Sequence, residues 1–157
     1  MEKIKNLVTI LLVTFALISI GFVLGKNSVK GVEINDFTSS GIKGNFVAVY
    51  YLHSTFRCVT CNTIEKLTYE LLNDSYDDKL SNGKIQWREI DFQENETIAK
   101  KFDVVASCVV VGRIVNGEFV EYQRLDNVWE LVNKPIEFKN YIARTIDENL
   151  ALMEEIE

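Results

Sequence analysis

Two of the three cysteines in this 157-residue chain, Cys58 and Cys61, lie three positions apart in the segment HSTFRCVTC. This spacing is typical of thiol-disulfide chemistry, because one sulfur attacks a disulfide and the second releases the product. The same pair would also supply half of a tetrahedral metal site. Two inert cysteines are the third interpretation. We favour a redox pair, which needs no cofactor other than the disulfide that the two cysteines form.

The residues around the pair predict where it lies in the fold. From Phe46 to Leu52 the run is almost entirely apolar, β-branched or aromatic, as in a central strand buried on both faces. After the cysteines, apolar residues recur at helical spacing over about residues 59 to 73. We therefore expect Cys58 in the first turn of a helix, where unpaired N–H groups and a partial positive charge favour a thiolate. Cys61, one turn further, is expected to be more buried.

The rest of the chain predicts three more strands and two more helices. The expected elements are a strand at 84–92, a short helix in ENETIAKKFDV, strands at 108–115 and in EFVEYQRL, a helical turn in NVWELV and a last helix from Pro135. Asn116-Gly117 joins the last two strands as a hairpin. The resulting order, β-α-β-α-β-β-α, predicts an α/β domain with a mixed four-stranded sheet and flanking helices, which is the thioredoxin-like arrangement.

An uncharged apolar run precedes this domain, from Leu7 to Leu24. A helix of about 18 apolar residues is long enough to span the hydrocarbon core of a bilayer, and no A-x-A-like cleavage site follows it. We expect an uncleaved anchor over 1–25, a tether over 26–44 and the thioredoxin-like domain over 45–157; a cleaved signal peptide is the alternative. The basic amino-terminal tail favours a single pass through the cytoplasmic membrane, with the domain outside the cytoplasm.

The net charge of −6 and the absence of a basic stripe argue against nucleic acid as a partner. The expected partners are the membrane, through residues 7–24, and protein thiols or disulfides or a membrane reductase.

The alternative function is a non-enzymatic module in which Cys58, Cys61 and Cys108 hold a soft metal, an iron-sulfur cluster or trivalent arsenic. His53 is the remaining residue that could complete a set of four ligands.

Several segments resemble small membrane-anchored thioredoxin-like proteins of the ArsF family of nitrophenyl compound nitroreductase subunits. They are VAVYYLHSTFRCVTC, NGKIQWREIDF, the hairpin VVASCVVV…NGE and LDNVWELVNKPIEFKNYI, and the resemblance covers about residues 46 to 145. It implies a thioredoxin-like fold, redox roles for Cys58 and Cys61, and a link to the reduction of arsenic or nitro compounds.

Compared with ordinary thioredoxins, the chain lacks an acid between Asn45 and Cys58 and a proline before the third strand, where a cis-proline faces the cysteine pair. Ser107 or Cys108 takes that place. Cys108 would bring a third sulfur to the pair, but we favour its being a small buried apolar residue.

For three neighbours of the cysteine pair, the sequence allows two roles each. Arg57 either stabilises the Cys58 thiolate or points into solvent. His53 or Tyr51 would replace the missing acid, although we favour a loop-capping role for His53 and core packing for Tyr51.

Overall fold

The computed structural model describes residues 6, 12, 14 and 44–155. The chain divides into two compact units, Met1–Glu33 and Ile34–Glu157. The predicted anchor over residues 7–24 and the tether over 26–44 lie almost wholly outside the described residues. Within the described part of the chain, no helix has the length and apolar character needed to cross a membrane.

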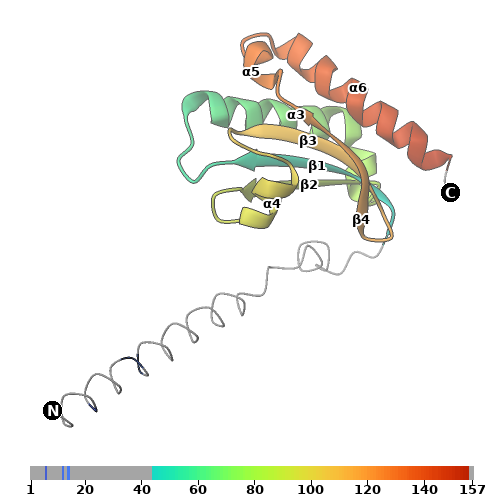
Figure 1. Cartoon of the computed structure of the whole chain (residues 1–157). Helices are drawn as coiled ribbons and strands as arrows, with labels where there is room; N and C mark the ends of the chain where they lie inside the picture. The colour runs from blue at the N-terminus through green and yellow to red at the C-terminus, as the bar shows by residue number, and fades with distance from the viewer. Residues whose placement is uncertain (1–5, 7–11, 13, 15–43, 156–157) are drawn as a thin grey trace. The chain divides into compact units, whose positions relative to one another are not determined.

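From residue 44 onwards, the chain forms a mixed four-stranded sheet with strand order β2-β1-β3-β4 and helices on both faces (Figure 1). The observed order matches the predicted β-α-β-α-β-β-α, with the expected helical turn present as the short helix α5. The elements are β1 (Phe46–His53), α3 (Val59–Ser81), β2 (Ile85–Asp91), α4 (Glu96–Lys101), β3 (Cys108–Val115), β4 (Glu118–Leu125), α5 (Val128–Leu131) and α6 (Pro135–Glu154).

β1 is one of the two inner strands of the sheet and is buried at all eight positions. It runs parallel to β2 and antiparallel to β3. Its side chains alternate between two apolar layers, because successive residues of a strand point to opposite faces. Val49 and Tyr51 face the layer formed with α3, α5 and α6, whereas Tyr50 and Leu52 face the layer formed with α4. Burial on both faces explains why polar and apolar residues do not alternate in the sequence of β1.

The sheet topology brings two loops to one edge. Leu52, next to the last residue of β1, pairs with Cys108, the first residue of β3. The loop that leaves β1 toward α3 therefore lies beside the loop that enters β3. The first loop contains Cys58 and the second ends at Ser107, so both reach the edge where the cysteine pair lies.

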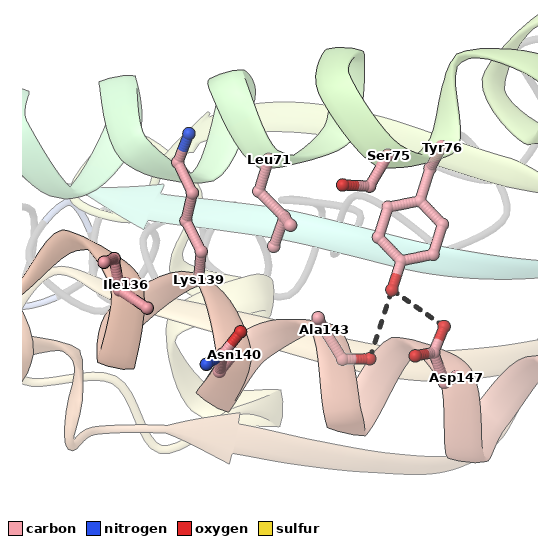
Figure 2. Close-up of a pocket in the computed structure, with 8 residues that line it drawn as sticks. All are labelled: Leu71, Ser75, Tyr76, Ile136, Lys139, Asn140, Ala143 and Asp147. Atoms are coloured by element: carbon pink, nitrogen blue, oxygen red, sulfur yellow. Dashed lines mark hydrogen bonds between the residues drawn. The ribbon is translucent and has the colours of Figure 1, made fainter.

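α3 is longer than the apolar spacing predicts, because its last two turns are mostly polar and exposed. The helix is kinked at Tyr76, whose φ of −133° and ψ of 18° are not helical. The Tyr76 hydroxyl donates hydrogen bonds to Asp147 Oδ1 at 2.7 Å and to the Ala143 carbonyl at 3.3 Å (Figure 2). These bonds fasten the second part of α3 to α6 across an open groove of about 520 Å³.

Candidate active site

Cys58 is the N-cap residue of α3 and has an exposed side chain. Its backbone is extended, with φ of −82° and ψ of 168°, and its carbonyl accepts the first helical hydrogen bond from the Asn62 N–H at 3.0 Å. The Cys61 N–H donates to Cys58 Sγ at 3.1 Å. A sulfur thus takes the position that a serine or aspartate oxygen usually occupies at the start of a helix. All three cysteines are free thiols in the structure.

These surroundings lower the pKa of the Cys58 thiol. The largest cause is a hydrogen bond from the Cys61 side chain, followed by the backbone N–H of Cys61, while partial desolvation acts in the opposite direction. The Thr60 backbone N–H adds a smaller contribution. Each of these donors stabilises the thiolate relative to the thiol. An exposed thiolate at this position is suited to attack a disulfide from solvent.

Cys61 is 5% exposed and lies one turn into α3. Its carbonyl accepts a hydrogen bond from the Tyr51 hydroxyl at 2.7 Å. Tyr51 is fully buried, and burial raises its pKa, so its phenol remains a hydrogen-bond donor. Tyr51 packs in the core and also links β1 to the helical turn that contains the second cysteine.

Arg57 is adjacent to Cys58, but its guanidinium contacts other groups. It forms ion pairs with Glu65 and, at 3.5 Å, with Glu89. A third contact joins Arg57 Nη2 to His53 Nε2 at 2.7 Å. The charge of Arg57 is therefore balanced by two carboxylates, and the lowered pKa of Cys58 has its main causes in the turn formed by residues 58–61.

His53 holds the loop between β1 and α3. The ring is 8% exposed, with Nδ1 3.0 Å from the Ser54 carbonyl and Nε2 facing Arg57. Since the carbonyl accepts and the guanidinium donates, the contacts fit a neutral ring with its hydrogen on Nδ1. His53 thus fixes the loop that precedes the nucleophile.

Ser107 and Cys108 point in different directions. The Ser107 hydroxyl donates to Cys61 Sγ at 3.8 Å. Cys108 is 1% exposed and packs in the apolar layer on the α4 side, where burial raises the pKa of its thiol to about 12. Consecutive side chains of extended backbone point to opposite faces, so only one of the two can face the pair.

The structure therefore does not bring Cys108 to Cys58 and Cys61, which removes the third ligand of the metal-binding alternative. Across the described residues, no group of three or more His, Cys, Asp or Glu side chains is placed to hold a metal ion.

Trp129 is a residue of the site that the sequence did not identify. Its indole Nε1–H donates to the Ser107 carbonyl at 2.7 Å. The sheet topology indicates that Trp129 lies near Ser107, because the end of β4 pairs with the beginning of β3 through Leu125 and Val109. The first residues after β4 therefore lie beside the residue that precedes β3.

Apolar side chains are exposed next to both loops of the site. Phe56 and Val59, on either side of Cys58 in the sequence, are 90% and 84% exposed. Val105, two residues before Ser107, is 88% exposed. Exposed apolar side chains beside a reactive group are typical of a surface that contacts another molecule.

No protein-family model and no curated protein matches the chain. Among solved structures, the chain is similar to one described as the structure of a malarial protein, with 18% identity, a TM-score of 0.42, and coverage of 67% of this chain and 98% of that one. It is also similar to oxidised mitochondrial thioredoxin 3 from Saccharomyces cerevisiae, with 19% identity, a TM-score of 0.41, and coverage of 67% and 87%.

Proposed function

We propose that this protein is a thiol-disulfide oxidoreductase in which Cys58 is the nucleophile and Cys61 the resolving cysteine. One observation carries the proposal: the exposed Cys58 thiol caps α3, accepts a hydrogen bond from the Cys61 N–H, and has a lowered pKa. An accessible thiolate with a second cysteine in the same helical turn has the parts that disulfide exchange requires.

In the reducing direction, the Cys58 thiolate attacks one sulfur of a substrate disulfide and releases the other sulfur as a thiolate. The product is a mixed disulfide between Cys58 and the substrate. Cys61 then attacks the Cys58 sulfur, forms the Cys58–Cys61 disulfide and releases the second substrate thiolate. Two electrons pass from the cysteine pair to the substrate, and the reverse sequence oxidises a dithiol.

The substrate class that we propose is a protein disulfide or dithiol. The exposed Phe56, Val59 and Val105 offer apolar contacts to a polypeptide that a small hydrophilic disulfide would not use. Residues 7–24 would tether the domain to the outer face of the cytoplasmic membrane and raise its effective concentration for other membrane proteins. In line with the resemblance to the ArsF family, a membrane-bound reductase is the proposed electron partner.

Reduction of insulin disulfides by dithiothreitol, with the full chain as catalyst, tests the oxidoreductase activity. We expect activity in the wild type and in Cys108→Ser, because Cys108 lies in the other apolar layer. Cys58→Ser should be inactive. Cys61→Ser should accumulate a mixed disulfide through Cys58, detectable by mass spectrometry. Activity retained in Cys58→Ser, or lost in Cys108→Ser with folding intact, would contradict the assignment.

A further inference from the structure

Resolution of the mixed disulfide requires Cys61 to react as a thiolate although it is 5% exposed. A buried anion is unfavourable unless hydrogen-bond donors replace the water that it has lost. The donors that stabilise Cys58 belong to the helical turn itself, and the side chain of Cys61 makes the largest contribution. Cys61 needs a donor from another element.

A buried carboxyl group does not provide this donor to Cys61. Across the described residues, the buried polar side chains are His53, Thr68, Gln86, Ser107 and Thr145, and none of these is an acid. The His53 ring makes its contacts with Ser54 and Arg57. The side chain that reaches the sulfur of Cys61 is Ser107, through its hydroxyl at 3.8 Å.

Ser107 is held in place by contacts on both of its polar groups. The residue is 3% exposed, its carbonyl accepts from Trp129 Nε1 at 2.7 Å, and its hydroxyl donates to Cys61 Sγ. A hydroxyl fixed in this way is oriented before the reaction begins. Preorganised donors stabilise developing charge without the cost of reorientation during the reaction.

We propose that Ser107 is a catalytic residue that donates a hydrogen bond to the Cys61 sulfur as that sulfur becomes a thiolate and attacks the Cys58 mixed disulfide. The inference rests on the proposed function. The Cys61 proton leaves to the substrate thiolate released in the first step or to water, and Ser107 keeps its own proton. The new bond joins the two cysteine sulfurs, and the bond that breaks joins Cys58 to the substrate. Trp129 is a positioning residue that acts through the Ser107 carbonyl.

The test uses the aromatic disulfide dithiobis(nitrobenzoate) with the reduced full chain, because this probe separates the two steps. Attack by Cys58 releases one coloured thiolate at a rate proportional to reagent concentration. Closure by Cys61 releases the second at a rate independent of reagent concentration. In Ser107→Ala, we expect the first phase to remain within about twofold of the wild type and the second to slow about five- to tenfold.

The pH profile and two further variants separate catalysis from structure. The second phase of Ser107→Ala should require a higher pH than that of the wild type, a shift that looser packing would not produce. Trp129→Phe should slow the second phase by a smaller factor and leave the first unchanged. Ser75→Ala, which removes an exposed hydroxyl beside the groove between α3 and α6, should match the wild type.

Equal second-phase rates and pH profiles in the wild type and Ser107→Ala would overturn the role of Ser107. If Ser107→Ala does not fold, equal second-phase rates in the wild type and Trp129→Phe would overturn it. The proposed function fails in a different way: the wild type would then show no concentration-independent second phase at all.

Discussion

The reactivity of Cys58 depends on the few atoms that surround one sulfur. The nearest cation in the sequence, Arg57, is paired with Glu65 and Glu89. The groups that lower the pKa of Cys58 are instead the Cys61 side chain and the N–H groups of the first helical turn. The position of Cys58 at the start of a helix therefore explains its lowered pKa better than the charge of its neighbour Arg57 does.

Alkylation of Cys58 by iodoacetamide as a function of pH measures this effect. The thiolate is the reactive form, so the rate should rise through a midpoint below the value of about 8.5 for an ordinary cysteine. Cys61→Ala should raise that midpoint, because alanine lacks the side-chain donor that makes the largest contribution. Arg57→Gln is the matched control and should move it little. A larger effect of Arg57→Gln than of Cys61→Ala would contradict this account.

At the scale of elements, the site depends on the register of the sheet. β3 pairs with both β1 and β4, and it brings Ser107 to the cysteines and to Trp129. Gly112 in the middle of β3 lies very close to β4: a Cβ there would be 2.5 Å from the Glu121 carbonyl oxygen and 2.7 Å from Tyr122 Cβ. This close approach requires a residue without a side chain.

Gly112→Ala should therefore reduce the free energy of unfolding by about 1 to 3 kcal/mol, as expected when an extra carbon is forced into a packed site. Gly44→Ala is the control, because a Cβ at Gly44 would have nothing within 4 Å. Chemical unfolding followed by circular dichroism measures both. Equal stability of the two variants would show that β3 and β4 do not approach as closely as described.

The sequence predicted the order of these elements because each signal is local. A fully apolar β1, the helical spacing in α3, the Asn116-Gly117 turn and Pro135 at the start of α6 are all visible within a few residues. The sequence could not decide between Ser107 and Cys108, because the choice depends on which of two adjacent side chains faces α3 once β3 is paired. Trp129 was missed because its partner is the backbone carbonyl of Ser107, which is 22 positions away in the sequence.

At the scale of the whole molecule, the proposed location depends on residues 7–24, most of which lie outside the described residues. We expect the full chain to sediment with membranes and to resist extraction by alkaline carbonate, because an 18-residue apolar helix is anchored by the hydrophobic effect. A variant that lacks residues 1–25 should be released.

A membrane-impermeant maleimide applied to intact cells reports the side of the membrane. It should label Cys58 if the domain is extracytoplasmic. Release of the full chain by carbonate would contradict the anchor, and failure of the reduced protein to label in intact cells, with labelling after lysis, would contradict the orientation.

Redox titration of the full chain in glutathione buffers, with thiol trapping and mass spectrometry, tests the central claim most directly. We predict a single two-electron step in which Cys58 and Cys61 are lost as thiols together while the buried Cys108 remains reduced, and the step should disappear in Cys58→Ser. Absence of such a step in the wild type, or a disulfide that includes Cys108, would contradict the account.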